Sequence, residues 1–423
     1  MATSQINQLR RRVVVTGIGV ITPSGNDPKT LWKNVTQGIS AAAPVTRFDA
    51  SKLPVKIAAE VKNFALSDYI GKVKEKRMDR TIQFAIAAAA SAVRDSGVDL
   101  DALADDRVAV IEGTAFSGAA STLKARDQFL SEESYRAMRP YNLVSSYCGE
   151  GSSAVSIALG IEGPAITCCS GCASGNDAIG FGLRMIQHDE VDVAVAGGSD
   201  EIIEMFHTGF CKLGSMSNRN ADPQTAMRPF DRSRNGFVLG EGAAFVVLEE
   251  LSHALARGAK IYAEVAGHGR RSEAYHPTDP HPNGHGYVFA MERSLRNARL
   301  HPDSVDYINA HGSATPQNDT IETAAVKRVF GSHASRLAIS ATKPVTGHMM
   351  GAAGAVESII SILSINNREI PPTINLRDPD DGCDLDYVRE ARPYPVRVAM
   401  CVNAGFGGRY SVLLFKMYDD PHS

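Results

Sequence analysis

The sequence lacks any uninterrupted apolar run of about 18 residues, the length that a membrane-spanning helix needs. It also lacks an excess of charge of one sign, because 44 Lys and Arg residues stand against 47 Asp and Glu residues. This near balance predicts no general affinity for nucleic acid or for an anionic membrane surface. Residues 1–12 are not followed by an apolar segment ending in a small-residue cleavage site, so we expect no secretory signal.

Cysteine is sparse, and its seven residues are scattered along the chain. An odd, scattered set fits reduced thiols better than a disulfide framework, so we expect a cytoplasmic protein. The length of 423 residues allows a large core and favours two or three domains, with one large α/β unit as the alternative.

Short β-rich runs alternate with longer helical patterns, which predicts a layered α/β fold. The expected strands cover residues 12–20, 108–112, 191–196, 243–249, 262–268, 307–309, 398–403 and 411–416. The expected helices cover residues 80–96, 176–188, 287–298, 319–329 and 352–365.

A weak internal sequence similarity suggests a duplicated architecture. Residues 171–175 and 351–354 each open an apolar helix with small side chains that permit close packing. Two similar βαβ-rich halves, joined near residues 251–260, would explain this similarity. The stretch 115–155 carries few strand signals, and we expect it to be an insertion that caps the site.

Cys172 stands among small residues at the start of an expected helix. The unpaired N–H groups and partial positive charge of a helix N-terminus predict a lowered thiol pKa and a nucleophilic thiolate. A cysteine in such surroundings is more often buried and inert. Cys169 and Cys172 also have the Cys-x-x-Cys spacing of a dithiol redox centre or half a zinc site, but a second Cys or His pair and a short thioredoxin-like chain are both missing.

Two histidines in glycine-containing runs, His311 and His348, complete a candidate constellation for acyl transfer through a thioester. A neutral ring at each position can donate its Nε2–H to a thioester oxygen, and two such donors would stabilise the enolate of a decarboxylated malonyl group. A purely structural role is the alternative for each. Lys343 would ordinarily be a solvated side chain, but its small neighbours suggest burial, with Glu322 as a possible partner.

Two further runs carry signals of their own. Residues 405–408 follow an expected strand, and their glycines allow backbone N–H groups to converge on an anion. Phe406 would then gate a pocket. A simple turn is the alternative. The basic run 71–80 is either a solvated face or a docking surface for an acidic partner.

These runs together resemble the β-ketoacyl-[acyl carrier protein] synthases, the condensing enzymes of fatty acid and type II polyketide synthesis. The resemblance spans nearly the whole chain. It rests on the motifs Gly-Cys172-Ala-Ser-Gly, Asn-Ala-His311-Gly, Lys343-x-x-x-Gly-His348 and Gly-Phe406-Gly-Gly. It implies a thiolase-like fold in α/β/α/β/α layers, with two similar halves at residues 1–255 and 256–423, usually assembled as a dimer.

The resemblance also implies a role for each candidate residue. Cys172 would be the acyl-accepting nucleophile, and His311 and His348 the pair that acts in decarboxylation and condensation. Lys343 and Glu322 would support the pair, while the N–H groups of Cys172 and Phe406 would form an oxyanion hole, with Phe406 as the gate. The substrate pocket would include Phe116, Gly405 and Gly407, and the carrier protein would dock on Lys72, Lys74, Lys76 and Arg77. No metal or diffusible cofactor is implied, because the phosphopantetheine arm arrives on the acyl carrier protein.

The departures from the family pattern bear on the pathway. Housekeeping enzymes typically read Phe-Gly-Phe-Gly-Gly-Thr-Asn where this chain reads Ala404-Gly-Phe-Gly-Gly-Arg-Tyr410, and Ser170-Gly-Cys replaces Thr-Ala-Cys. Runs 274–276, 317–319 and 383–388 look like those of type II polyketide ketosynthase subunits, which often pair with a chain-length factor that lacks the cysteine. Retention of Cys172 predicts the active partner. The alternatives are a homodimeric fatty acid elongation synthase and a catalytically silent scaffold.

Overall fold

The computed structural model describes residues 10–71 and 78–419. The strands of its main sheet are β1 (Val13–Ile21), β4 (Val108–Gly113), β5 (Ala165–Cys168), β6 (Val193–Asp200), β7 (Gly242–Glu250), β8 (Ala263–Ser272), β9 (Tyr307–Asn309), β10 (Ala338–Ser340), β12 (Asp386–Tyr387), β14 (Val398–Gly405) and β15 (Arg409–Lys416). Their spatial order is β12-β10-β9-β14-β15-β8-β1-β7-β6-β4-β5. Two small ribbons pair β2 (Ala43–Pro44) with β3 (Ile57–Ala58) and β11 (Glu369–Ile370) with β13 (Arg392–Pro393).

The main sheet consists of two halves with one topology. In the order β5-β4-β6-β7-β1, the first two pairings are parallel and the next two antiparallel. The order β10-β9-β14-β15-β8 repeats this sequence of directions. The halves meet where β1 pairs with β8 through only two residue pairs, Val14 with Glu264 and Val15 with Ala263. A division of the chain between residues 255 and 256 stays a prediction.

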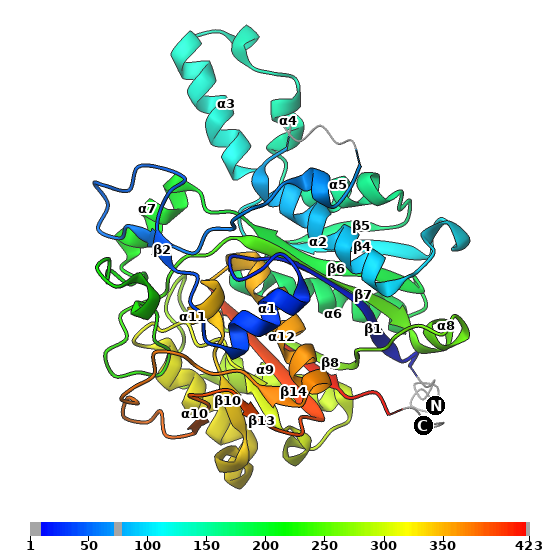
Figure 1. Ribbon diagram of the computed structural model, residues 1–423, viewed down its shortest axis with the longest axis vertical. Coiled ribbons are helices and arrows are strands. Elements are labelled where there is room, and N and C mark those ends of the chain that lie inside the picture. The colour runs from blue at the N-terminus through cyan, green and yellow to red at the C-terminus, as the bar shows by residue number, and fades with distance from the viewer. Residues whose placement is uncertain (1–9, 72–77, 420–423) are drawn as a thin grey trace.

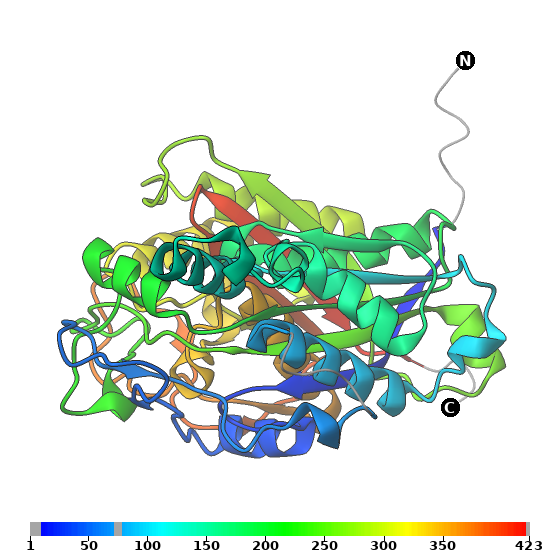
Figure 2. The same cartoon turned by 90° about the horizontal axis from the view of Figure 1, so that it is seen from above.

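Helices cover both outer faces and fill the space between the halves. They are α1 (Pro28–Thr36), α2 (Arg80–Ser96), α3 (Ala119–Glu132), α4 (Tyr141–Ser145), α5 (Glu150–Leu159), α6 (Ser174–Gln187), α7 (Glu204–Leu213), α8 (Leu251–Ala256), α9 (His285–Ala298), α10 (Asn318–Phe330), α11 (Lys343–Thr346) and α12 (Ala353–Asn367). α2 packs on β1, β7 and β6, and α9 packs on β8 and β15, while α6 and α12 contact both halves (Figures 1 and 2). The expected layered α/β fold is confirmed. Among the described helices, none combines the length and the apolar character needed to cross a membrane.

The two central helices, α6 and α12, contact each other through the small residues that form the internal sequence similarity. A Cβ added to Gly175 would lie 2.7 Å from the backbone nitrogen of Ala355, and one added to Gly354 would lie 2.7 Å from Oδ1 of Asn176. Only glycine permits so close an approach. Because α6 begins beside Cys172, this contact fixes the position of the thiol relative to the second half of the chain.

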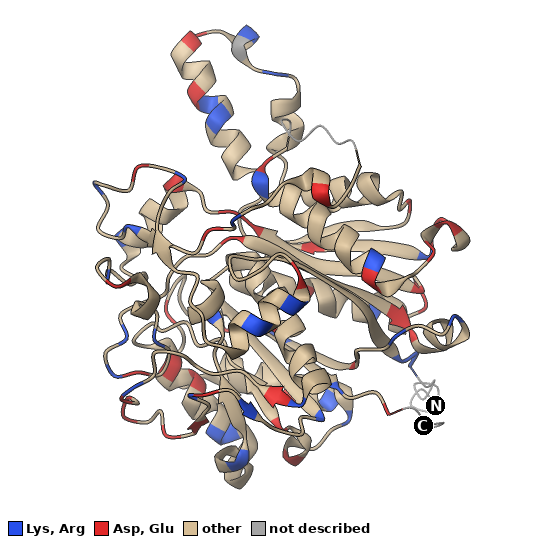
Figure 3. Ribbon diagram, viewed as in Figure 1, with Lys and Arg blue, Asp and Glu red and all other residues tan. Residues whose placement is uncertain are grey.

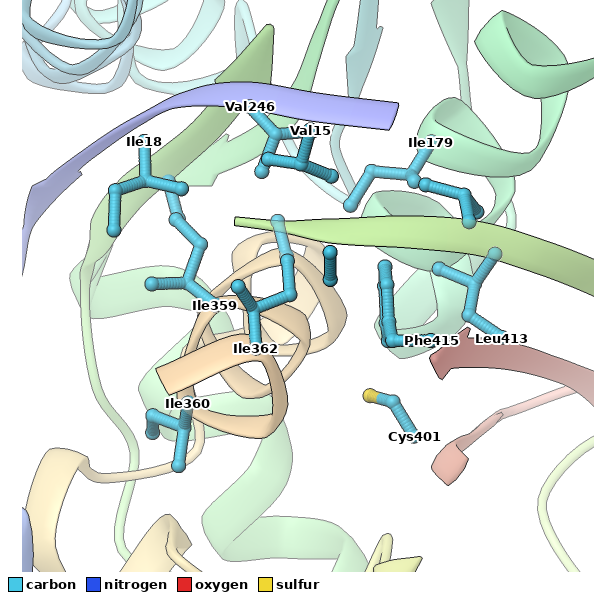
Figure 4. Packing of buried hydrophobic residues seen from close by; sticks show 14 of the residues in the cluster. Val15, Ile18, Ile179, Val246, Ile359, Ile360, Ile362, Cys401, Leu413 and Phe415 are labelled. Carbon is cyan, nitrogen blue, oxygen red and sulfur yellow. The ribbon is translucent and has the colours of Figure 1, made fainter. Parts of the chain in front are cut away.

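The rest of α12 is buried in the main hydrophobic core. Ile359 and Ile362 pack among Val15 and Ile18 of β1 and Phe415 of β15, as Figure 4 shows. Side chains this well buried each contribute about 1.5–3 kcal/mol to the free energy of folding. Acidic and basic residues are instead interspersed over the loops and outer helices (Figure 3). The core thus provides a rigid support for the segments that carry the candidate site.

No described residue of the segment 115–155 lines the cavity of Cys172, and a capping role of this segment stays a prediction. α3 and α4 project from the body of the molecule, at the top of Figure 1. Their segment leaves large apolar side chains in solvent, among them Leu130, Tyr135, Leu143 and Tyr147. Exposed apolar surfaces of this kind are typical of contacts with another molecule.

Candidate active site

Cys172 lies in a short turn between β5 and α6. Residues Gly171–Ala173 form one 3₁₀ turn directly before α6, so the expected placement at a helix start is confirmed. The side chain is 8% exposed and lines a cavity of about 80 Å³. His311 and His348 line the same cavity, so three residues that are far apart in the sequence meet at one place.

The expected lowering of the Cys172 pKa is not found. Burial raises the pKa of the thiol to about 12, and the positive charge of Lys343 opposes this increase only in part. The physical reason is that a thiolate loses its hydration in a buried site, and this loss outweighs the attraction of a nearby cation. The resting side chain is therefore a thiol, which must lose its proton as the sulfur attacks a carbonyl carbon.

His311 and His348 face each other at the cavity, with ring centroids 5.6 Å apart and planes 81° apart. Nδ1 of His311 accepts the backbone N–H of Ala404, and Nδ1 of His348 accepts that of Met350, both at 3.3 Å. A neutral ring that accepts at Nδ1 carries its proton on Nε2. Burial and the charge of Lys343 also hold the pKa values of both imidazoles well below 6.5. Both rings are thus neutral Nε2–H donors.

Lys343 is fully buried, as expected, but its partner is Glu357 rather than Glu322. Its Nζ lies 2.6 Å from Oε1 of Glu357 and donates to the carbonyl oxygen of His311 at 2.7 Å. Glu357 in turn accepts the side-chain N–H of Asn403 at 3.0 Å. The sequence carried one signal for Glu357, which is the only charged residue of helix α12.

Glu322 supports the site through the backbone instead. Its two oxygens accept the N–H groups of His311 at 2.8 Å and Gly312 at 2.9 Å. Burial raises the pKa of this carboxyl to about 7. One turn earlier on α10, Asp319 accepts the N–H groups of Phe230 and Ala314. Two carboxylates thus shape the loop that carries His311.

The loop after β14 runs beside the turn of Cys172. A Cβ added to Gly405 would lie 3.1 Å from the backbone nitrogen of Cys172, and one added to Gly171 would lie 3.9 Å from that of Phe406. This proximity places the backbone nitrogens of Cys172 and Phe406 near each other, beside the cavity that both residues line. The Phe406 ring is 39% exposed and lines the cavity together with Gly405, whereas Gly407 donates its N–H to the carbonyl oxygen of Pro277 at 2.7 Å.

Phe116 lies behind the cavity wall. Its ring stacks on Phe206 with a centroid distance of 3.9 Å, and it lies 6.2 Å from Phe210, which lines the cavity. The backbone N–H of Phe116 is held by the buried carboxylate of Asp200. Phe116 is therefore one aromatic layer away from the space around Cys172.

The cavity mouth also includes polar residues that sequence reasoning missed. They are Thr278, Asp279, Ser313, Thr315 and Asn318. Ser313 and Thr315 directly follow the motif of His311, so their adjacency was a usable signal. Thr278 and Asp279 belong to the connection between β8 and α9, and no sequence pattern linked that connection to the site.

The Cys-x-x-Cys pair, metal binding and the docking surface concern residues outside the cavity lining or only partly within it. Cys169 is exposed, and its sulfur points to the carbonyl oxygen of Ala115, so the two thiols of the Cys-x-x-Cys pair have different surroundings. The described residues assemble no group of three or more His, Cys, Asp or Glu side chains that could hold a metal ion. The predicted docking residues Lys72, Lys74, Lys76 and Arg77 lie outside the described residues.

The site combines a buried thiol, two neutral N–H donors and the neighbouring backbone nitrogens of Cys172 and Phe406. Such a set can hold an acyl group on sulfur and stabilise negative charge on a carbonyl oxygen.

Comparison with known proteins agrees with this chemistry. The N-terminal domain model of beta-ketoacyl synthases matches residues 10–254, and the C-terminal domain model matches residues 262–377. The chain is 43% identical to 3-oxoacyl-[acyl-carrier-protein] synthase 2 of Coxiella burnetii, a match that covers 97% of this chain and 100% of the relative. The protein of the same name from Synechocystis is 39% identical, with coverage of 97% and 99%.

Solved structures with the same fold include both single enzymes and complexes. The ishigamide ketosynthase/chain length factor superposes with a TM-score of 0.89 at 36% identity, and a beta-ketoacyl synthase from Burkholderia phymatum superposes with a TM-score of 0.90 at 33% identity. A type II polyketide ketosynthase bound to its acyl-carrier protein and the hexaketide has a TM-score of 0.90 at 32% identity. Each match covers 97% of this chain and 100% of the other. The chain therefore belongs to the beta-ketoacyl synthase family of condensing acyltransferases.

Proposed function

We propose that the protein catalyses the decarboxylative Claisen condensation of malonyl-[acyl carrier protein] with an acyl chain held on Cys172, in a type II polyketide pathway. The observation that carries the proposal is the pair of neutral histidines, His311 and His348, that share one cavity with the Cys172 thiol.

The first half-reaction loads the enzyme. The sulfur of Cys172 attacks the acyl thioester carbonyl, and its proton passes to the departing pantetheine thiol as the old carbon–sulfur bond breaks. The N–H groups of Cys172 and Phe406 stabilise the tetrahedral oxyanion, a contribution of about 2.7–4 kcal/mol for each donor in comparable sites. Phe406, on the exposed side of the cavity, gates the entry of the second substrate.

The second half-reaction forms the new carbon–carbon bond. The malonyl carboxylate leaves as carbon dioxide, and the electron pair of the broken bond passes into an enolate whose oxygen accepts the Nε2–H groups of His311 and His348. The enolate carbon then attacks the acyl-Cys172 carbonyl, and the cysteine sulfur leaves and regains a proton. Lys343, Glu322 and Glu357 act as positioning residues, and the cycle needs no metal or diffusible cofactor.

The polyketide assignment rests on the residues that depart from the housekeeping pattern and on the ketosynthases of polyketide systems among the structural relatives. Arg409 stands where housekeeping enzymes have Thr, and its guanidinium donates to the carbonyl oxygen of Cys169 at 3.0 Å. This substitution therefore contacts the segment that carries the nucleophile. Fatty acid elongation is the second candidate, because relatives with up to 43% identity are named 3-oxoacyl-[acyl-carrier-protein] synthase 2. Either pathway would place the protein in the cytoplasm.

Two protein partners follow from this function. The acyl carrier protein would bring both substrates and dock on Lys72, Lys74, Lys76 and Arg77. A second subunit, either another copy or a chain-length-factor-like chain, would cover the projecting segment of α3 and α4 together with the edge strand β5, where Ile166 is 42% exposed. Uncovered strand edges and apolar patches favour association with another chain.

The test is an assay of the purified chain with acyl-loaded and malonyl-loaded carrier protein, with and without a candidate partner subunit, followed by the intact mass of the carrier. We expect 3-oxoacyl carrier only with wild-type Cys172. Repeated condensation without reduction, dependent on the partner, supports the polyketide pathway. Use of saturated acyl carriers by the chain alone supports fatty acid elongation. A Cys172 that neither accepts an acyl group nor reacts with iodoacetamide would leave only the silent-scaffold alternative.

A further inference from the structure

A second cavity, of about 440 Å³, lies at the far end of α6 from Cys172. It is lined by Arg10 and by residues of α6, β8 and α9, which include Arg184, His188, His268, Arg270, Phe289, Arg293 and Asn297. Because a helix rises about 1.5 Å per residue, the chain from Cys172 to Arg184 separates the two cavities by roughly 18 Å. The second cavity is therefore distinct from the candidate active site.

The lining of this cavity carries four guanidinium groups and no carboxylate. None of the four takes part in an ion pair of the described residues, and Nη2 of Arg184 is buried without a hydrogen-bond partner. Burial and the nearby charge of Arg270 lower the pKa of Arg184. Only Arg184 of the four is half-buried, whereas Arg10, Arg270 and Arg293 are exposed. A half-buried cation with an unused donor is stabilised when an anion binds beside it.

Nearby carboxylates compensate the charge of the cavity only in part, because the charge of Asp177 raises the pKa of Arg184 but burial and the charge of Arg270 outweigh it. Asp177 lies close to Nε2 of His268 and accepts the hydroxyl of Ser170. At the end of α6, Asp189 and Asp192 pair with Arg11 and Arg107 rather than with the residues of the cavity. The positive charge of the cavity therefore remains available for an external anion.

Two of the four guanidinium groups are also held in fixed positions. Arg184 and Arg270 both lie over the ring of Phe181, with centroid distances of 4.4 and 4.8 Å. Cation–π contacts of this kind orient the planar forks without using their N–H donors. Little conformational freedom is then lost when these groups bind a ligand.

We infer that this cavity binds an anion that carries two or more phosphate groups. Guanidinium forks match the oxygens of phosphate bidentately, and four of them around one space favour a polyphosphate over a single carboxylate. The volume lies within the range of sites for small molecules, and Phe289 provides an apolar wall. The same chemistry is found in inorganic pyrophosphate and in a nucleoside bisphosphate.

The test is calorimetric titration of the full-length chain at fixed ionic strength with pyrophosphate, adenosine 3′,5′-bisphosphate and citrate. We expect one site per chain for at least one phosphate ligand, and tighter binding of that ligand than of citrate. Arg270→Met and Arg293→Asn should each weaken binding by about tenfold or more, since each removes charged hydrogen bonds. Arg296→Ala, an exposed arginine of α9 outside the lining, should bind like wild type. Retention of condensation by all three variants shows that they are folded.

Four outcomes would overturn the inference. They are the absence of saturable binding to wild type, equal binding by wild type and the two cavity variants, binding of citrate as tight as that of the phosphates, and a change of molar mass in Arg270→Met. The last result, measured by light scattering, would mean that a protein subunit rather than a small anion occupies the cavity.

Discussion

Nζ of Lys343 lies 2.6 Å from Oε1 of Glu357, and both side chains are almost completely excluded from solvent. The same ammonium group donates to the carbonyl oxygen of His311, and its charge lowers the pKa values of His311 and His348. One ion pair thus connects α11, α12 and the segment after β9, and its ammonium group adds to the burial that keeps both imidazoles neutral.

We expect Glu357→Gln and Lys343→Met each to lower the free energy of unfolding by about 3–5 kcal/mol, because each leaves an uncompensated buried charge. The double variant should lose less than the sum of the two, since it removes both charges. Urea denaturation measures the stabilities. A condensation assay should show that neither Lys343→Met nor the double variant has wild-type activity. Strictly additive losses would mean that the two side chains are not coupled.

Cys172→Ala should abolish acyl loading and condensation while the fold persists, because the side chain is small and its role is chemical. Intact mass of the protein after incubation with acyl carrier measures the loading. Cys172→Gln is the companion variant, since its neutral amide resembles the carbonyl of a loaded thioester. This variant should still release carbon dioxide from malonyl carrier. Acyl mass retained on the alanine variant would contradict the assignment of the nucleophile.

Long periodic elements of this chain could be predicted from the sequence. The expected helix 80–96 coincides with α2, and the expected strand 411–416 lies within the eight-residue strand β15. β5 and β10 were missed, because each has only three or four residues and pairing with neighbours, rather than local pattern, defines them. The capping role expected for the segment of α3 and α4 stays a prediction, because its apolar residues carry no sign of whether they face the chain itself or another molecule.

The candidate site was predictable in its members but not in all its contacts. Motifs brought Cys172, His311 and His348 together, and the structure places them in one cavity. The choice between Glu322 and Glu357 as the partner of Lys343 depends on tertiary packing, which spacing along the chain cannot decide. The direction of the Cys172 pKa shift likewise depends on burial, and a sequence does not reveal the degree of burial.

His311→Ala and His348→Ala should each reduce condensation by more than about 100-fold, as expected for the loss of one donor to a developing oxyanion. Transfer of the acyl group to Cys172 should be less affected, because the backbone N–H groups beside the thiol remain. Single-turnover rates of loading and of condensation, measured separately on each variant, check this division. Near wild-type condensation in both variants would refute the two-histidine mechanism.

The two imidazoles should also make stability depend on pH. Their folded pKa values lie well below 6.5, whereas in the unfolded chain they titrate near that value. Below pH 6.5 the unfolded state therefore binds more protons, and stability falls with decreasing pH by up to about 1.4 kcal/mol per unit for each histidine.

The check is urea denaturation between pH 7.5 and 5.5 for wild type and His348→Asn. The asparagine can still accept the N–H of Met350 but does not titrate. Buried carboxyls such as Glu322, whose pKa is raised to about 7, contribute with the opposite sign in both proteins and cancel in the comparison. The variant should show the weaker loss of stability at low pH. Equal slopes would mean that folding does not lower the pKa of His348.

The last prediction concerns Phe116, which stacks on Phe206 and contacts the wall residue Phe210. If the protein acts as a homodimer, Phe116→Ala should open space behind this wall and admit longer acyl chains. The loss of stability should stay below the 3–5 kcal/mol typical of a fully buried phenylalanine, because Phe116 is only half-buried. Leu255→Ala on the exposed surface of α8 is the control and should leave product length unchanged. Mass spectrometry of the acyl carrier gives the length profile. If the folded Phe116→Ala variant gives an unchanged length profile, another residue limits the acyl chain. If the length profile changes with the identity of the partner subunit instead, chain length is set by a heterodimer.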